Sequence, residues 1–158
     1  ERIRLKLPKG NPMDRIYNSI MPMHHGRKIA FDLIDEEYDN VVFCRYDIKF
    51  NQLFQFEGVD RVVTPEEQAY NIISDIFAIM PFKVAKHYFL YDNIEPLLAT
   101  LFEPEFEQYL KNRINYQDWE VHIHKYERYC PHILLLRSLY NNGVEFVTTP
   151  QIDVKIQR

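Results

Sequence analysis

The feature that most constrains the fold is the stretch Asn40–Phe50, NVVFCRYDIKF. It begins with Val41–Cys44, a continuously apolar run rich in β-branched residues, which is typical of a strand buried on both faces. The run stops at a cation, an aromatic ring and an anion: Arg45, Tyr46 and Asp47. Because open α/β sheets bind ligands at the carboxyl ends of their strands, the sequence places the candidate site here.

The rest of the chain alternates between helical and extended patterns. Helices are expected at Met13–Met21, where Pro22 would end the helix, and at His24–Tyr38, Pro65–Tyr70, Phe82–Tyr91, Asn93–Phe102, Pro104–Asn112 and His132–Tyr140. Strands are expected at Val41–Cys44, Ile76–Met80, Val144–Val147 and Ile152–Ile156, and extended segments at Arg2–Lys6 and Trp119–His124. This order predicts an α/β fold with a mixed, mostly parallel sheet flanked by helices.

Three local patterns support these boundaries. The helix His24–Tyr38 would bury one apolar face, made of Ile29, Ala30, Leu33 and Ile34. The sequence Thr64-Pro65-Glu66-Glu67 is a capping box with proline at the first helical position. Asn141-Asn142-Gly143 supplies a C-cap for the helix His132–Tyr140.

Composition excludes several classes of function. The net charge is -4 and the basic residues are scattered, so no basic stripe for nucleic acid is present. Only four glycines occur, with no G-x-G-x-x-G or Walker loop. The longest apolar run is far shorter than the ~20 residues of a transmembrane helix. Two cysteines without C-x-x-C spacing suggest reduced thiols, and we expect a cytoplasmic protein with no transmembrane segment.

Arg45 and Asp47 can act on one ligand, because residues two apart in an extended segment point to the same side. Arginine suits a phosphate bidentately, and aspartate suits a divalent metal or a sugar hydroxyl. The alternative is a structural ion pair at the end of the strand. Asp75, just before Ile76–Met80, is a second candidate, although a lone carboxylate there is most often a cap or turn residue. Its interest rises if that strand neighbours Val41–Cys44.

A metal site is a further alternative. His122 and His124 share a face if Trp119–His124 is extended, and two imidazoles at that spacing can hold a metal with a third ligand. A metal hydrolase built on this pair predicts stoichiometric bound metal. Exposed or core-satisfied histidines are the better interpretation.

Three pieces of sequence together resemble a known family. They are YDNVVFCRYDIKF, then ISDIFAIMPFKVAKHYF, then PHILLLRSLYNNGVEFV followed by IDVKIQR. In this order they resemble capsule- and lipopolysaccharide-type glycosyltransferases with a GT-A-like fold, which occur in bacteria and large viruses. The resemblance covers about Arg15–Arg158.

The resemblance implies transfer of a sugar from a nucleotide-sugar donor to a hydroxyl of a glycan acceptor. It puts Arg45, Tyr46 and Asp47 at the nucleotide-sugar site, with Asp47 as ligand to a divalent cation such as manganese or magnesium. It makes Asp75 and Glu127 the candidate catalytic carboxylates.

Two departures from the family qualify what the resemblance implies. The family usually begins with a strand and a Gly-x-x-Arg-like turn, which have no counterpart here, so residues 1–158 are expected to be a single glycosyltransferase-like domain lacking its amino-terminal strand. The family also tends to have an acid where this chain has Pro131-His132. These departures motivate a second hypothesis, a non-catalytic interaction or scaffold domain of a larger protein.

Overall fold

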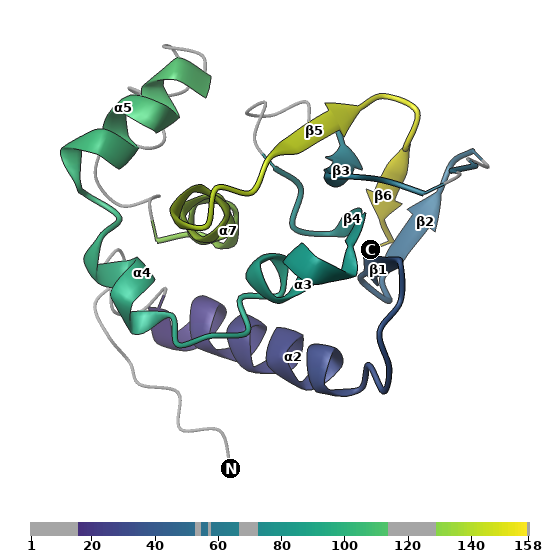
Figure 1. Ribbon diagram of the computed structural model, residues 1–158, viewed down its shortest axis with the longest axis horizontal. Helices are drawn as coiled ribbons and strands as arrows, with labels where there is room; N and C mark the ends of the chain where they lie inside the picture. The colour runs from purple at the N-terminus through teal and green to yellow at the C-terminus, as the bar shows by residue number, and fades with distance from the viewer. Residues whose placement is uncertain (1–15, 53–54, 57, 67–72, 114–128, 158) are drawn as a thin grey trace.

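A computed structural model describes residues 16–52, 55–56, 58–66, 73–113 and 129–157 (Figure 1). This part of the chain is an α/β structure whose larger sheet is mixed. Its helical segments are the π-helix η1 (Ile16–Ile20) and the α-helices α2 (Met21–Asp32), α3 (Phe82–Tyr88), α4 (Glu95–Ala99), α5 (Pro104–Arg113) and α7 (Pro131–Asn141). Its strands are β1 (Asn40–Cys44), β2 (Ile48–Phe50), β3 (Val62–Pro65), β4 (Phe77–Pro81), β5 (Phe146–Thr149) and β6 (Val154–Ile156).

The strands form two sheets. The larger has the order β1-β4-β3-β5, and the smaller pairs β2 with β6. Strand β4 runs antiparallel to both β1 and β3, β2 runs antiparallel to β6, and β3 runs parallel to β5. The expected mixed sheet is therefore present, but the pairing in the described residues is mostly antiparallel and the prediction of a mostly parallel sheet is not confirmed. Apolar strands can be buried in either kind of sheet when both faces are covered.

Strand β4 lies at the centre of the layers, and it confirms the strand predicted at Ile76–Met80. All of its residues are buried. Alternate side chains point to opposite faces: Ala78 and Met80 pack among the helices, whereas Phe77 and Ile79 pack against the small β2–β6 sheet. A continuously apolar run is therefore required at this position.

Strand β1 is less buried than predicted. Val41 and Phe43 pack against the helical core, but Val42 is 45% exposed and Cys44 is also exposed. Strand β1 is an edge strand of the larger sheet, and only the face that carries Val41 and Phe43 is packed against the core. The prediction of burial on both faces is therefore wrong. Its apolar sequence alone does not distinguish this position from a central one.

Helix α2 begins earlier than predicted and buries a different face. Pro22 lies in its first turn, where proline is tolerated, and does not end a preceding helix. Ile29 and Leu33 of the expected apolar face are 48% and 78% exposed. The side that packs against the core instead carries Met23, Arg27 and Phe31, and it continues from Ile20, the last residue of η1.

Helix α7 is the central helix of the core. It follows Pro131, contacts α3 and α4, and buries seven consecutive residues, from Ile133 to Leu139. Burial on all sides explains its apolar composition. The predicted C-cap is confirmed: Gly143 has φ +60°, and the Val144 N–H donates to the Leu139 carbonyl at 2.9 Å.

The capping box predicted at Thr64 does not begin a helix at Pro65. Thr64 and Pro65 belong to β3 and pair with Thr148 and Thr149 of β5. A residue before proline favours the extended conformation, which fits this strand. Glu66 is not helical either, and its N–H donates to the Thr149 carbonyl at 3.2 Å. Residues 67–70 of the predicted helix and the extended segments Arg2–Lys6 and Trp119–His124 lie outside the described residues. Within the described ranges, no helix is long and apolar enough to span a bilayer.

Candidate functional site

The antiparallel pairing of β1 with β4 brings two predicted site segments together. Cys44, the last residue of β1, is opposite Phe77, the first of β4. One residue further, the Arg45 N–H donates to the carbonyl of Ile76 at 3.0 Å. Arg45 therefore lies next to Asp75, although Arg45 follows its strand and Asp75 precedes its own. The condition that made Asp75 interesting, that β4 neighbours β1, is met.

Arg45, Tyr46 and Asp47 connect β1 to β2. The segment turns at Tyr46 and Asp47 and is not extended as predicted. The two charged side chains still meet: Arg45 Nε donates to Asp47 Oδ1 at 2.9 Å, and Nη2 donates to Oδ2 at 2.5 Å. The Asp47 carbonyl accepts from the N–H of Gln157, just after β6, at 2.7 Å. The turn is thus held by the small sheet, and Tyr46 is fully exposed at its tip.

The Arg45–Asp47 pair lies at the surface. The side chains are 39% and 24% exposed. Hydrogen bonding from Arg45 lowers the pKa of Asp47, and hydrogen bonding to Asp47 raises the pKa of Arg45. The pair is therefore the ion pair that the structural alternative expects. Its partial exposure also leaves both groups within reach of a ligand, as the functional alternative expects.

Asp75 has a partner that the sequence did not reveal. Its Oδ1 lies 3.2 Å from Nε2 of His132, the second residue of α7. Burial raises the pKa of Asp75, but the hydrogen bond and charge of His132, together with the charges of Arg27 and Arg45, outweigh burial and leave this pKa below its ordinary value. Asp75 is therefore a carboxylate at neutral pH.

The side chain of Arg27 contacts the segment that contains Asp75. Its guanidinium donates to the backbone carbonyls of Tyr88 at 2.7 Å and of Asp75 at 2.9 Å, and it lies 4.4 Å from the centre of the Phe43 ring. The residue is only 4% exposed. Arg27 therefore joins α2, α3 and the segment before β4. Its positive charge also acts on the Asp75 carboxylate. Sequence reasoning missed Arg27 because arginine on a helix is normally assigned to solvent.

The pairing of Asp75 predicts a pH-dependent stability. Because its pKa is lower in the folded chain than its ordinary value of about 4, the pairing stabilises the fold above that value. The contribution is lost as the pH falls through the folded pKa. We expect Asp75→Asn to lower the free energy of unfolding by about 1.5–3 kcal/mol at neutral pH, and by less in acid. Urea unfolding near pH 7 and near pH 3 measures both.

The exposed Asp92, substituted to Asn, is the matched control for this experiment. Its substitution should change the free energy of unfolding by no more than about 0.5 kcal/mol at neutral pH. An Asp75→Asn deficit that is the same at both pH values would show that the carboxylate charge is not what stabilises this edge.

The remaining predicted site residues are not placed. Glu127, His122 and His124 lie outside the described residues, so the second catalytic carboxylate and the histidine metal site stay predictions. Within residues 16–52, 55–56, 58–66, 73–113 and 129–157, no three histidine, cysteine or acidic side chains are grouped closely enough to hold a metal ion by themselves. Cys44 and Cys130 are not joined by a disulfide.

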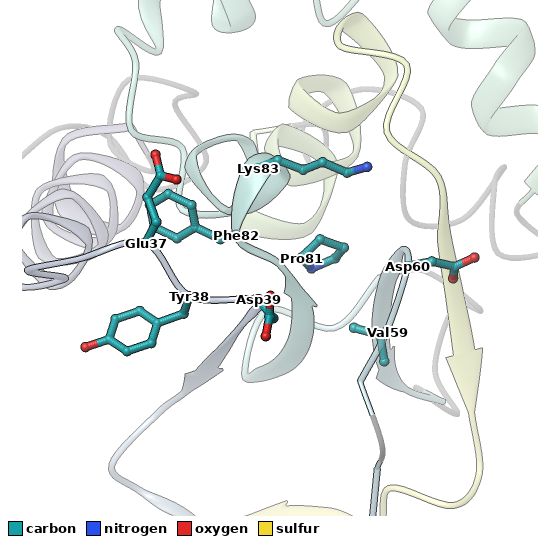
Figure 2. A pocket seen from close by; sticks show the side chains of 8 residues that line it. All are labelled: Glu37, Tyr38, Asp39, Val59, Asp60, Pro81, Phe82 and Lys83. Carbon is teal, nitrogen blue, oxygen red and sulfur yellow. The ribbon is translucent and has the colours of Figure 1, made fainter.

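An open cleft of about 360 Å³ lies where β1 begins and β4 ends, at the other end of these strands from Arg45 and Asp75 (Figure 2). Three carboxylates and one amine line it, and the Tyr38 ring and the Lys83 amine extend in different directions from its centre. None of the predicted site residues contributes to it. Its lining residues are Glu37, Tyr38, Asp39, Val59, Asp60, Pro81, Phe82 and Lys83.

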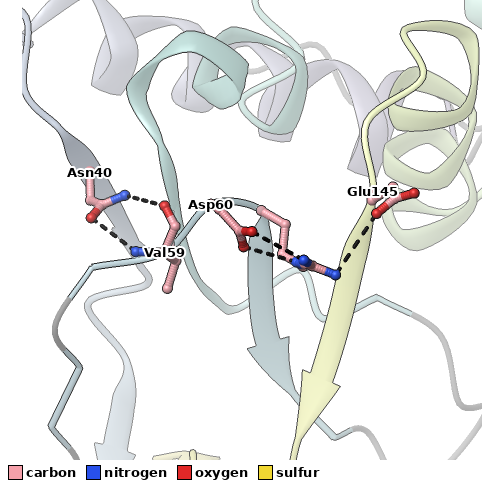
Figure 3. Close-up of polar contacts among 5 residues, drawn as sticks. Asn40, Val59, Asp60 and Glu145 are labelled. Atoms are coloured by element: carbon pink, nitrogen blue, oxygen red, sulfur yellow. Dashed lines mark hydrogen bonds and ion pairs between the residues drawn. The ribbon is translucent and has the colours of Figure 1, made fainter.

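Polar contacts fix one wall of this cleft (Figure 3). The Asn40 amide donates to the Val59 carbonyl at 2.9 Å and accepts from the Val59 N–H at 3.2 Å. Arg61 pairs with Asp60 through two hydrogen bonds, of 2.9 and 3.1 Å, and lies 3.9 Å from Glu145. Asn40 thus holds the segment before β3 against β1, and these contacts are structural.

Comparisons with protein-family models, with curated proteins and with solved structures find no match to this chain.

Proposed function

We propose that the chain is a glycosyltransferase that moves a sugar from a nucleotide-sugar donor to a hydroxyl of a glycan acceptor, with a GT-A-like site and a cytoplasmic location. The observation that supports this function most is the meeting of Arg45, Asp47 and Asp75 where β1 ends and β4 begins. Their charges affect one another, since Asp75 contributes to the pKa values of both other residues. Offsetting charge on a leaving diphosphate is the main electrostatic task of this reaction.

Arg45 is the group suited to the diphosphate. Its guanidinium is partly exposed and presents a planar set of donors that fits phosphate oxygens. In the described structure Asp47 takes two of those donors. A phosphate would therefore exchange with Asp47 as the partner of Arg45, releasing the carboxylate. Tyr46, fully exposed between them, offers an aromatic face for the sugar or the base.

Asp47 is the group suited to a divalent cation. Magnesium is commonly held by one or two carboxylates together with substrate phosphates, so a complete cage of protein ligands is not required. Asp47 is partly exposed, and it would offer one such carboxylate once a phosphate has replaced it as the partner of Arg45. A cation bound there would supply further neutralisation of the leaving diphosphate.

Nucleotide binding tests the proposal. Calorimetry with uridine, guanosine, cytidine and adenosine diphosphates, with and without manganese, should find one nucleotide whose affinity rises with the metal. Arg45→Ala should weaken it about 10- to 100-fold, because a hydrogen bond to a charged group contributes about 1.5–3 kcal/mol. Asp47→Asn should remove the effect of manganese.

Arg61→Ala is the matched control, because Arg61 makes the same two-bond contact with a neighbouring aspartate far from the proposed site. It should leave nucleotide affinity unchanged. If the native protein binds none of the four nucleotides, the glycosyltransferase proposal is wrong.

An interaction domain is the second candidate function. It is favoured by large apolar side chains at the surface, among them Ile29 of α2 and Leu33 just after it, which are 48% and 78% exposed. Exposed apolar surface often marks a protein-binding site. This candidate predicts no nucleotide binding, and Ile29→Lys with Leu33→Lys would weaken association with a partner without changing stability. The same calorimetry therefore separates the two functions.

A further inference from the structure

Strand β1 has one edge with no partner strand in the described part of the chain. It is the last strand of the larger sheet, and β4 pairs with its other edge. The Asp39 carbonyl and the Arg45 N–H are hydrogen bonded to the residues that flank β4. In an antiparallel pair, residues bonded to the partner strand alternate with residues whose backbone groups point the other way. The outward-pointing N–H and carbonyl groups are therefore those of Asn40, Val42 and Cys44.

These outward backbone groups are open to another strand. Within the described ranges no other segment hydrogen bonds to them, and the side chains of Val42 and Cys44 are exposed. Edge strands are usually protected from pairing by proline, lysine or a bulge. Strand β1 contains neither proline nor lysine and keeps an unbroken register with β4. The opposite edge strand, β5, is followed directly by Pro150. Strand β1 is therefore the edge of this sheet that is suited to pair with another chain.

The sequence around β1 is complementary to itself when it is reversed. The acid Asp39 precedes the apolar strand, and the cation Arg45 follows it. We infer that β1 pairs antiparallel with β1 of a second copy of this chain, with the two Val42 residues facing each other at the two-fold axis. In this register Asp39 of each copy lies opposite Arg45 of the other, and opposite charges at facing positions stabilise a strand pair.

Backbone bonding and charge favour the same register. With Val42 at the axis, Asn40 of each copy faces Cys44 of the other, so every outward-pointing residue of β1 has a backbone partner. Facing pairs of this kind exchange two hydrogen bonds. A shift by two residues leaves outward groups at one end of the strand without a partner and separates Asp39 from Arg45.

The two charged groups are available for this contact. Asp39 is exposed and forms no ion pair with any residue that the structure describes. The Arg45 side chain is 39% exposed and uses Nε and Nη2 for Asp47, which leaves Nη1 for a second carboxylate. Pairing of the two copies would thus bring a cation to Asp39 without breaking the Arg45–Asp47 pair.

The dimer is expected to be weak. One short strand edge from each copy buries less than the ~1,000 Å² of a stable protein interface. We expect the native protein to associate with a dissociation constant of about 10–500 μM, measured by sedimentation equilibrium. This inference goes beyond the proposed function and does not depend on it.

Cross-linking tests the register. Val42→Cys, made together with Cys44→Ser, places two thiols at the axis, where facing Cα atoms are about 5.5 Å apart and a disulfide fits. The native protein is the matched control, because four residues of strand, roughly 14 Å, would separate its two Cys44 residues. Under mild oxidation we expect the variant to form a disulfide-linked dimer at least about tenfold faster than the native protein.

Charge variants test the contacts. Val42→Lys should weaken dimerisation about tenfold or more, because like charges would face each other at the axis. Val147→Lys, the same substitution at a 40% exposed valine of β5, should leave dimerisation unchanged. Asp39→Lys and Arg45→Glu should each reduce self-association, and an equimolar mixture of the two should restore it, because each substituted side chain then faces an opposite charge. Urea denaturation shows which variants are folded.

Two results would overturn the inference. If Val42→Cys cross-links no faster than the native protein, β1 does not pair with a second copy in this register. The same conclusion follows if Val42→Lys is folded and associates as the native protein does. Nucleotide binding is a separate measurement on the native protein, so failure of the glycosyltransferase proposal would leave the dimer unaffected.

Discussion

Replacing Arg27 with alanine is expected to lower the free energy of unfolding by about 3–5 kcal/mol, because the substitution leaves two carbonyls without the donor that now satisfies them. Those carbonyls belong to Tyr88 and Asp75, at 2.7 and 2.9 Å from the guanidinium. The substitution also removes the cation from the face of the Phe43 ring, 4.4 Å away. Urea denaturation measures the change as a shift in the midpoint.

Two variants refine this expectation. Arg27→Lys keeps the charge but lacks the planar fork, so it can satisfy fewer acceptors and should fall between the native protein and the alanine variant. Lys28→Ala is the control on the adjacent residue: Lys28 is exposed and its Nζ lies 5.0 Å from the Tyr91 ring, so the cost should be about 0.5–1 kcal/mol. If Arg27→Ala costs no more than Lys28→Ala, Arg27 does not join these elements.

The burial of Arg27 also explains why the face of α2 was predicted wrongly. Apolar spacing favoured Ile29 and Leu33, which are exposed. The buried stripe runs through Ile20 and Phe31 and places a cation between them. A pattern rule that counts only apolar residues cannot identify a buried helix face whose central residue is charged. The burial of Arg27 is tolerated because backbone carbonyls from distant segments accept its hydrogen bonds.

Two local sequence patterns predicted the structure correctly, and one did not. Five consecutive apolar residues, ended by Pro81, correctly indicated the strand at β4, and Gly143 correctly marked the end of α7. The capping box at Thr64 indicated a helix where the chain forms β3. That strand is stabilised by pairing with β4 and β5, which are distant in sequence, and such pairing overrides a local preference.

The sequence predicted only part of the candidate site, because its other contacts depend on strand pairing and helix packing. Arg45 and Asp47 are neighbours in sequence, and their meeting could be expected. The approach of Asp75 followed only if β4 paired with β1, which the sequence left open. His132 was noted only as a departure from the family, because its contact with Asp75 depends on how α7 packs against the sheet.

Phe77 connects the site to the core, and Phe77→Ala is expected to cost about 3–5 kcal/mol of unfolding free energy. The side chain is 1% exposed and packs between the two sheets, with its ring edge-on to Phe50 at a centroid distance of 5.3 Å. Removing it leaves a cavity beneath β2 and β6. Chemical denaturation measures the loss, and Val147→Ala, at a 40% exposed position of β5, is the control expected to cost about 0.5 kcal/mol.

Phe77→Ala should also weaken nucleotide binding, although Phe77 is not one of the residues proposed to contact the nucleotide. Strands β2 and β6 hold the turn that carries Arg45 and Asp47, since the Asp47 carbonyl is bonded to the Gln157 N–H just beyond β6. Loosening the small sheet should therefore weaken nucleotide binding at temperatures where the variant is still folded. Phe77→Leu, which fills part of the cavity, should recover part of both losses. If Phe77→Ala is strongly destabilised but binds nucleotide as the native protein does, the turn is held by the larger sheet alone, through the contact of Arg45 with Ile76.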